Sequence, residues 1–361
     1  MTSDFSKLNP ITLINTGQID LLDTSGTYDV DRYPWAYQAW KKQQQIHWIG
    51  EEVPLSEDLK DWRSDRLTLE ERSLLTQVFR FFTQSDIEVS DNYFKRYIPL
   101  FQPLEIQMMM AAFTNMETVH IDAYALLLTT LGMPKTEFSA FKEYAQMSAK
   151  ADYMQSFGTA TCEDVARTLA MFGAFTEGLS LFASFAMLMN FPRFNKMKGM
   201  GQIIAWSVRD ESLHCESMIK LYHEWAKETE SVNASVKSDI LDVAKTIVNL
   251  EDKFIELAFS LGDVDGLSMA DMKNYIRYIC DWRLAQLRLP PLFGYFDNSK
   301  GVVKQQREHP LPWLPLILNG VEHANFFESR ATEYSKGATR GEWHGDQGTW
   351  AKFGRYVADQ E

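Results

Sequence analysis

Apolar residues recur at helical spacing along most of this chain, and the alternation expected of β-strands is scarce. Four long helices are predicted. The first begins at the capping box Thr68-Leu-Glu-Glu71, and the second is opened by Pro103 and closed by Gly132. The third covers about residues 161–189 and the fourth about 193–225. Further helices are predicted at about residues 31–45, 136–154, 232–260, 268–287 and 321–334. The pattern therefore predicts an all-α fold.

Acidic and histidine side chains interrupt the apolar stripes of these four long helices. The pairs Glu117-x-x-His120 and Glu211-x-x-His214 each place a carboxylate and an imidazole on neighbouring turns of one helix face. Before each pair, the preceding long helix carries a lone acid in its stripe, Asp86 in the first and Glu177 in the third. A charged group in an apolar stripe is costly unless it is paired or binds a cation.

Four carboxylates and two histidines on four helices are the donor set of a carboxylate-bridged two-metal site. A network of buried salt bridges is the alternative interpretation. Because the set is rich in oxygen, with one nitrogen per ion, it favours iron or manganese over structural zinc. Glu117 and Glu211 would bridge or flank both ions, each histidine would bind one ion, and the two lone acids would be terminal ligands. The predicted ligands are Asp86, Glu117, His120, Glu177, Glu211 and His214. The expected fold is a ferritin-like four-helix bundle core with additional helices.

Composition and charge narrow the remaining possibilities. Of the 361 residues, 45% are apolar and 24% are charged, as in an ordinary globular protein. The net charge of −13 and the lack of a long basic run argue against a nucleic-acid partner. No apolar run reaches the about 18 uncharged residues of a membrane span, and the N-terminus lacks a signal core, so a cytoplasmic protein is expected. The three cysteines are scattered and fit core thiols in a reducing compartment.

Three residues outside the six ligands are candidates for redox or supporting roles. Tyr124 lies one turn after His120 on the same face, where a phenol beside an oxidising metal pair can lose one electron; the alternative is a hydrogen-bonded core tyrosine. Asp210 precedes Glu211 and could accept a hydrogen bond from a ligand histidine. Trp48 is distant in sequence, and only the resemblance described next links it to the site.

The segments Glu117-Thr-Val-His120-Ile-Asp-Ala-Tyr124 and Val208-Arg-Asp-Glu-Ser-Leu-His214 resemble those of the small, radical-generating subunit of class I ribonucleotide reductase. Ser85-Asp86 and Asn325-Phe-Phe-Glu-Ser-Arg-Ala-Thr-Glu-Tyr334 extend the resemblance, which covers about residues 30–335. It implies a dinuclear site that reacts with oxygen or a reduced form of it. The stored oxidant would serve the large subunit, which reduces ribonucleoside di- or triphosphates to the deoxyribonucleotides needed for DNA replication. A di-iron site is the first expectation, and Mn/Mn or Mn/Fe are alternatives.

The resemblance also implies a path for the stored oxidant. Storage is expected on Tyr124, and transfer through Asp210 and Trp48 to a tyrosine near the C-terminus. Tyr334 is favoured for that last position because a family-like segment surrounds it, whereas the competitor Tyr356 has no such motif. The expected organisation is an N-terminal arm at 1–30, a metal-binding helical domain at 31–334 and a tail at 335–361 that docks on the large subunit. A homodimer is expected from the family.

Two positions depart from the family pattern near the predicted radical pocket. Leu181 stands where phenylalanine is frequent, and Ser207 stands where a branched apolar residue is usual. The first ligand is Asp86 rather than glutamate, which favours the family members that use a tyrosyl radical over those that run on a manganese–iron pair.

Two other functions would use the same six ligands. The first is a ferritin-like oxidase or hydroxylase that acts on a substrate of its own. The second is a non-enzymatic iron store. Neither function explains Trp48, Tyr334 and an aromatic-rich tail.

Overall fold

The computed structural model describes residues 19–24, 26, 30–138, 140–299 and 302–318. At positions 83–86, 88, 138, 141–142, 151 and 154–155 only the backbone is described. The chain divides into two compact units, residues 1–314 and 315–361, and every element named below belongs to the first. The predicted helix at 321–334 and the predicted tail at 335–361 lie outside the described residues, as does most of the predicted arm at 1–30.

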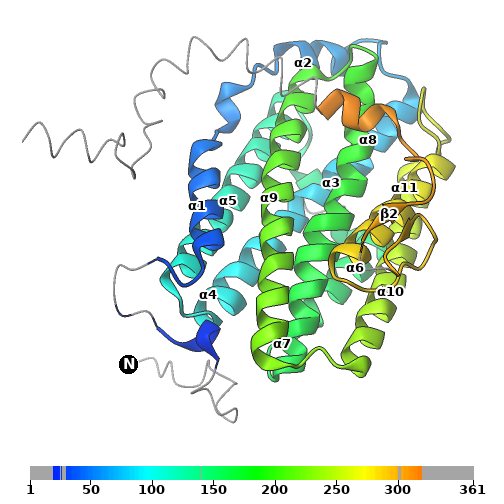
Figure 1. Ribbon diagram of the computed structural model, residues 1–361. Coiled ribbons are helices and arrows are strands. Elements are labelled where there is room, and N and C mark those ends of the chain that lie inside the picture. The colour runs from blue at the N-terminus through cyan, green and yellow to red at the C-terminus, as the bar shows by residue number, and fades with distance from the viewer. Residues whose placement is uncertain (1–18, 25, 27–29, 139, 300–301, 319–361) are drawn as a thin grey trace, which may run out of the picture. The chain divides into compact units, whose positions relative to one another are not determined.

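The described residues are mainly helical, and the all-α prediction is confirmed (Figure 1). Within the described part of the chain, one two-stranded antiparallel sheet pairs Phe296 with Gln305. The α-helices are α1 (Pro34–Gln45), α2 (Ser56–Arg63), α3 (Leu69–Asn92), α4 (Ile98–Leu100), α5 (Leu104–Leu131), α6 (Ala145–Gln155), α7 (Cys162–Leu169), α8 (Leu181–Arg193), α9 (Lys198–Thr229), α10 (Ala234–Ala258) and α11 (Met269–Gln286). The other elements are the π-helices η5 (Tyr93–Tyr97) and η8 (Ala170–Ser180), the 3₁₀ turns η3 (Asp20–Leu22), η4 (Gly50–Glu52), η6 (Lys135–Phe138) and η7 (Ala140–Glu143), and the strands β1 (Phe296–Asp297) and β2 (Lys304–Gln305).

Two of the long helices begin or end where the sequence predicts. Thr68 caps α3: its hydroxyl accepts a hydrogen bond from the Glu71 amide, and the Glu71 carboxylate accepts one from the Thr68 amide. Pro103 is the N-cap of α5, and Gly132 ends that helix with a φ of 76°, in the left-handed region that favours glycine. Local chemistry therefore fixes these boundaries.

The third long helix differs from the prediction in its middle and at its end. Its central part, η8, is π-helical, and the Thr176 hydroxyl donates to the carbonyl of Met171, five residues earlier. Pro192 does not end the helix but lies in the last turn of α8. The fourth helix therefore begins at Lys198, not at Arg193. The predicted helix at 136–154 begins as two 3₁₀ turns and becomes α-helical only at Ala145.

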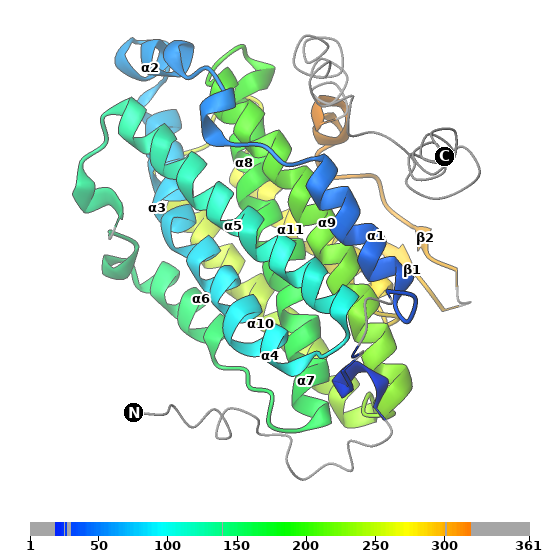
Figure 2. The same cartoon turned by 90° about the vertical axis from the view of Figure 1, so that its left-hand side faces the viewer.

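The run Cys162–Arg193 is long and apolar enough to cross a membrane, but 94% of its most apolar window is buried inside the protein. It is therefore a core helix. It packs on α9, while α3 packs on α5 and α5 also contacts α9 (Figures 1 and 2). Gly173 and Gly178 allow the close approach, because an added Cβ would lie 2.5 Å from Met218 Cβ and 2.6 Å from Cys215 Sγ. α10 and α11 cover the other side of η8, and α1 packs on α5 and α9.

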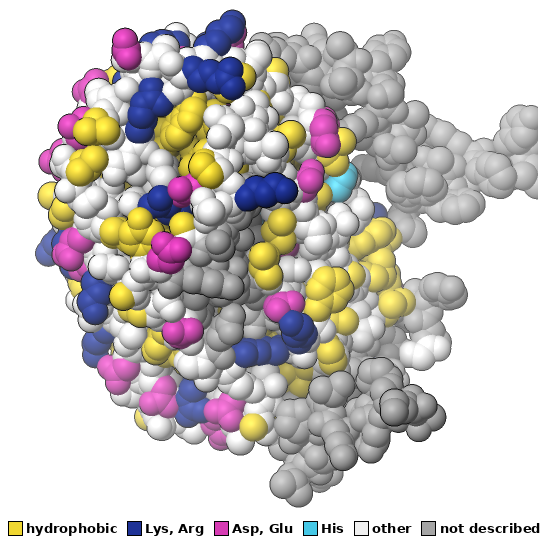
Figure 3. All heavy atoms as spheres, turned by 180° about the vertical axis from the view of Figure 1, so that it is seen from behind, with side chains coloured by type: hydrophobic (Ala, Val, Ile, Leu, Met, Phe, Trp, Pro, Cys, Tyr) yellow, Lys and Arg dark blue, Asp and Glu magenta, His cyan; other side chains and the backbone are white. Residues whose placement is uncertain are grey.

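The surface of the described residues carries charges of both signs. On the face seen in Figure 3, lysine and arginine side chains are interspersed with aspartate and glutamate. This mixture is usual for a charged protein surface.

Candidate metal centre

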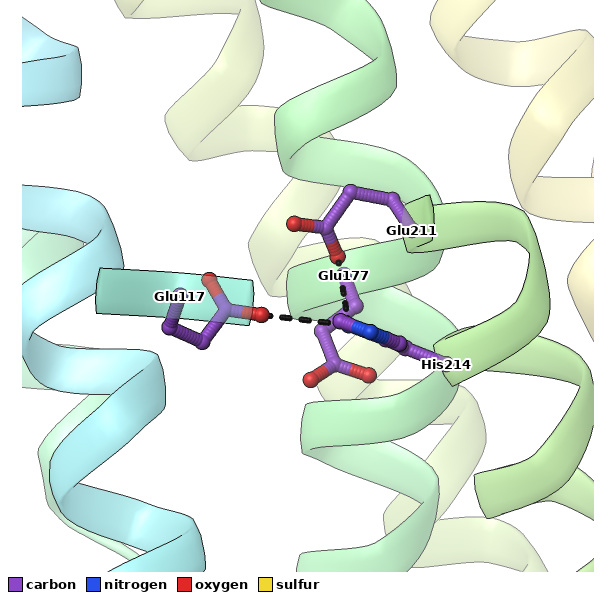
Figure 4. A group of neighbouring side chains, drawn as sticks. All are labelled: Glu117, Glu177, Glu211 and His214. Atoms are coloured by element: carbon purple, nitrogen blue, oxygen red, sulfur yellow. Dashed lines mark ion pairs between the residues drawn. The ribbon is translucent and has the colours of Figure 1, made fainter. Parts of the chain in front are cut away.

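Three helical elements bring four of the predicted ligands to one buried point (Figure 4). α5 supplies Glu117, η8 supplies Glu177, and α9 supplies Glu211 and His214. One ligand atom from each of these four side chains lies within 4.8 Å of the others, and all four are buried. The fifth predicted ligand, His120, is also fully buried and lies beside the two central glutamates.

Each of the two central glutamates lies between the two histidines. Glu117 Oε2 is 3.6 Å from His120 Nδ1, and Glu117 Oε1 is 3.1 Å from His214 Nδ1. Glu211 repeats the pattern, with Oε1 3.3 Å from His120 Nδ1 and Oε2 3.6 Å from His214 Nδ1. Every glutamate oxygen thus lies toward one imidazole, and each glutamate reaches both. Two carboxylates that span two imidazoles in this way form the donor set of a bridged pair of ions.

The atoms that point into this cluster lack good hydrogen bonds among the described residues. They are both carboxylate oxygens of Glu117 and Glu211, Oε2 of Glu177, and Nδ1 of both histidines. Buried polar atoms without partners are rare, and each requires an explanation such as a bound ion. Oxygen-rich donors with one nitrogen for each ion suit iron or manganese. The side chains therefore fit two such ions.

The outward-facing nitrogens of the histidines are held by a shared network. His120 Nε2 lies 3.3 Å from Asp210 Oδ2, as the sequence suggested for Asp210. His214 Nε2 lies 3.1 Å from Gln43 Oε1, and the Gln43 amide donates to Asp210 Oδ1 at 3.3 Å. Partners of this kind fix the tautomer and orientation of a ligand imidazole. Gln43 was not predicted from the sequence, because its only signal is that a polar residue lies on the face of α1 that packs on α5 and α9.

Trp48 reaches the site despite its distance in sequence. Its indole Nε1 donates to Asp210 Oδ2 at 2.7 Å, so Asp210 contacts both Trp48 and His120. The Trp48 ring centroid lies 5.9 Å from that of His120 and 5.1 Å from that of the half-buried Trp206. A continuous chain of contacts therefore leads from His120 toward the ring of Trp206.

Glu177 has a partner that the sequence did not indicate. The hydroxyl of Tyr93 donates to Glu177 Oε1 at 2.6 Å, and both side chains are buried. Burial and the nearby Glu177 carboxylate raise the pKa of the Tyr93 phenol well above its usual value, so it is a stable donor.

Tyr124 lies in an aromatic pocket on the His120 side of the cluster. It is 5% exposed, and its ring centroid is 4.8 Å from that of Phe82 and 6.4 Å from that of His120. Its hydroxyl donates to Ser207 Oγ at 2.9 Å. Ser207 thus contacts the phenol directly, and Leu181, the other position that the resemblance marks as unusual, is buried.

Without bound ions, the neighbouring carboxylates raise the pKa of both histidines and favour their protonated forms. Burial alone would lower the pKa of His214, but interactions with Glu117 and Glu211 outweigh it and raise the pKa to about 10. Burial would raise the pKa of Glu117, but His120 and His214 lower it to about 2. Burial, with the charge of Glu211, raises the pKa of Glu177 well above its usual value.

The other predicted positions are only partly described. Asp86 lies on α3, whose backbone packs on α5, but its side chain is outside the described part of the protein. Tyr334 and Tyr356 lie outside the described residues.

Comparison with known proteins identifies the family. The family model for the ribonucleotide reductase small chain matches residues 29–299. The chain belongs to this family. It is 37% identical to the probable ribonucleoside-diphosphate reductase small subunit 376L of Invertebrate iridescent virus 6, over 90% of this chain and 98% of that protein. The ribonucleoside-diphosphate reductase subunit beta of Chlamydia pneumoniae is 25% identical, over 89% of this chain and 92% of that one.

Solved structures of the family share the fold. The ribonucleotide reductase R2 subunit from Clostridium botulinum matches with a TM-score of 0.72 at 20% identity, covering 82% of this chain and 92% of that one. Dimanganese(II)-NrdF from Streptococcus sanguinis matches with a TM-score of 0.65 at 22% identity, covering 75% of this chain and 94% of that one. The predicted ferritin-like fold of a small-subunit core is therefore confirmed.

Proposed function

We propose that this chain is the radical-generating subunit of a ribonucleoside-diphosphate reductase and holds a pair of metal ions between Glu117 and Glu211. The observation that carries the proposal is that each of these carboxylates reaches both buried histidines. A salt bridge requires only one contact between a carboxylate and a histidine. A carboxylate that bridges two ions must instead lie near the ligand histidines of both ions. Curated relatives that match most of the chain are named as reductase small subunits.

In this proposal each predicted ligand has a distinct role. His120 and His214 each bind one ion, Glu177 is the terminal ligand on the His214 side, and Asp86 is the terminal ligand on the other side. Iron is the first candidate and manganese the second, since a solved relative with the same fold is named as a dimanganese protein. When bound, the reduced ions would supply electrons to oxygen or to a reduced form of it, and the oxidised site could then remove an electron from a nearby phenol.

Tyr124 is the proposed storage site for the oxidising equivalent. Its burial excludes water from the ring. The Ser207 hydroxyl accepts a hydrogen bond from the phenol and can donate one to the phenoxyl oxygen after oxidation. Transfer proceeds through Asp210 and Trp48, which are joined by a 2.7 Å hydrogen bond. The last relay on this chain is assigned to Tyr334, in preference to Tyr356.

The partner is the large subunit, where the ribonucleotide is reduced. We assign the docking role to the tail at 335–361, and we expect the small subunit to be a homodimer in the cytoplasm. Membership in the family supports these assignments.

The test combines spectroscopy with a reductase assay. Metal-free protein is loaded with ferrous iron, exposed to air and examined by electron paramagnetic resonance, then mixed with a cognate large subunit and a ribonucleoside diphosphate. The proposal predicts a tyrosyl signal, its loss in Tyr124→Phe with metal binding retained, and deoxynucleotide formation that requires both subunits. A ferric mineral would indicate an iron store, and turnover of an added substrate without the large subunit would indicate an oxidase.

A further inference from the structure

Tyr93 connects the two π-helical segments of the described structure at the metal cluster. It is the first residue of η5, which directly continues α3, and it donates to Glu177, which lies in η8. The contact thus ties the helix that carries Asp86 to the helix that carries Glu177. π-Helical segments are rare and concentrate at functional sites.

The Tyr93 ring is held in place on several sides. Its centroid lies 6.1 Å from that of Phe113 and 6.4 Å from that of His214, with ring planes at 69° and 81°. It also meets the ring of Tyr97 at 6.1 Å in an edge-to-face contact. Because the ring is packed on three sides and is 1% exposed, its hydroxyl has a fixed position.

The hydrogen bond from Tyr93 gives the two carboxylate oxygens of Glu177 different roles. Oε1 accepts the Tyr93 proton at 2.6 Å, while Oε2 has no hydrogen-bond partner among the described residues. A carboxylate held by one oxygen can offer the other to an ion but cannot rotate freely to offer both. Glu177 belongs to the cluster that includes His214, and the oxygen that Tyr93 does not engage is the one left to bind an ion there.

We propose that Tyr93 is a positioning residue that restricts Glu177 to single-oxygen ligation of the ion on the His214 side. This inference rests on the proposed metal site. In the absence of the Tyr93 hydroxyl, Glu177 could rotate and bind the same ion through both oxygens. Tyr93 would thereby keep a coordination position open on that ion.

The chain provides a matched control one turn away. Tyr97 is also in η5 and is also 1% exposed, but its hydroxyl donates to the backbone carbonyl of Thr168 at 3.1 Å. Tyr97→Phe therefore removes a buried hydroxyl of the same kind without touching a predicted ligand. Any difference between Tyr93→Phe and Tyr97→Phe reports the contact with Glu177.

The test uses cobalt(II), whose visible absorption bands weaken as its coordination number rises. Metal-free full-length protein, Tyr93→Phe and Tyr97→Phe are titrated with Co²⁺ without oxygen, and stoichiometry, stepwise Kd values and spectra are recorded. The Tyr93→Phe variant is expected to bind two ions, with one Kd changed about 10- to 100-fold and with weaker bands for that ion. Tyr97→Phe should match the wild type.

A second comparison removes Glu177 itself. In a Glu177→Ala background, adding Tyr93→Phe should change neither the Kd values nor the spectrum, because the residue that Tyr93 orients is gone. This double variant also removes both partners of the buried hydrogen bond, so it avoids an unpaired polar group if Tyr93→Phe alone folds poorly.

The outcomes separate this inference from the proposed function. If the wild type and Tyr93→Phe give the same Kd values and spectra, or if Tyr97→Phe gives the same change, the positioning role is wrong while the metal site stands. An effect of Tyr93→Phe that persists in the Glu177→Ala background also overturns it. If the wild type binds no Co²⁺, the metal site itself fails, and the role of Tyr93 falls with it.

Discussion

The hydroxyl of Tyr124 donates a hydrogen bond to Ser207 Oγ at 2.9 Å, and Ser207 in turn donates to the carbonyl of Ile203 at 3.1 Å. The proposed radical site is therefore hydrogen-bonded within an aromatic pocket, not surrounded by apolar groups alone. Once the phenol has lost its proton and one electron, the Ser207 hydroxyl can turn and donate to the phenoxyl oxygen. A donated hydrogen bond withdraws spin density from that oxygen.

Ser207→Ala should change the spectrum of the radical without preventing metal binding. Because the donor is lost, the largest principal g value of the tyrosyl radical should rise, and high-field electron paramagnetic resonance measures it. Ser212→Ala is a suitable control, since Ser212 lies on the same helix and donates to a backbone carbonyl. An unchanged g value in Ser207→Ala would show that the radical does not contact this serine.

Substitution along the proposed relay should separate radical formation from nucleotide reduction. Trp48→Phe and Tyr334→Phe should both keep the tyrosyl signal but lose deoxynucleotide formation with the large subunit, because phenylalanine is much harder to oxidise. Tyr356→Phe should keep both properties. Full reductase activity in Tyr334→Phe, with loss in Tyr356→Phe, would move the relay to Tyr356.

The metal-free protein should lose stability as the pH rises above neutrality. His214 has a pKa of about 10 in the folded protein against an ordinary value of 6.5, so its stabilising protonated form is complete below pH 6.5 and is lost toward pH 10. The raised pKa of Glu177 acts in the same direction, because ionising this buried carboxyl becomes costly above its ordinary range.

The thermal midpoint measured with a chelator should therefore be lower at pH 9 than at pH 6.5. His214→Gln should show a smaller fall, since it removes one of the groups whose pKa is raised. Bound ions replace the protons, so the loaded protein should lack most of this dependence. A midpoint that rises toward pH 9 in the metal-free wild type would contradict the assigned protonation of the cluster.

A buried ion pair between α6 and α10 should contribute to the stability of the folded protein. Lys150 Nζ lies 2.6 Å from Glu251 Oε1, both side chains are fully buried, and the Lys150 ammonium is 3.6 Å from the centre of the Phe81 ring. The Ser180 hydroxyl, at the end of η8, also donates to Glu251 at 2.6 Å. Glu251→Ala should lower the free energy of unfolding by about 3–5 kcal/mol, because it removes the buried carboxylate that pairs with the buried Lys150 ammonium.

Denaturant unfolding of the metal-free protein measures this loss. Replacing both partners with methionine, in Lys150→Met/Glu251→Met, should recover most of the stability, since neither charge is then buried alone. If the double variant is as unstable as Glu251→Ala, packing and not the broken ion pair accounts for the effect.

The sequence predicts helices and helix ends where local chemistry decides them. Thr68, Glu71, Pro103 and Gly132 act through hydrogen bonds and backbone angles within a few residues, and their predicted roles are confirmed. The helix was wrongly expected to end before Pro192. A proline in the last turn leaves the hydrogen bonds of the earlier turns intact, so the helix continues to Arg193. η8 packs on α9 and α11, and the periodicity of one helix does not contain such contacts, so it did not predict the π-helical register.

The residues of the site also divide into those that local spacing predicts and those that depend on tertiary packing. Glu117, His120, Glu211 and His214 were found because their spacing on a helix is a signal in itself, and the structure brings them together with Glu177. Gln43 and Tyr93 were missed because they reach the cluster from α1 and η5 as isolated residues. Trp48 was included only through family resemblance, and the packing of α1 against α5 and α9 explains why such a distant residue reaches Asp210.

The most direct test of the two-metal site is a titration of the metal-free protein with Mn²⁺, followed by electron paramagnetic resonance. Bridging by Glu117 and Glu211 would hold two ions about 4 Å apart, close enough for their spins to couple. We expect two Mn²⁺ per chain and an exchange-coupled spectrum that becomes that of isolated ions in Glu117→Ala. One ion per chain, or two ions with uncoupled spectra in the wild type, would contradict it.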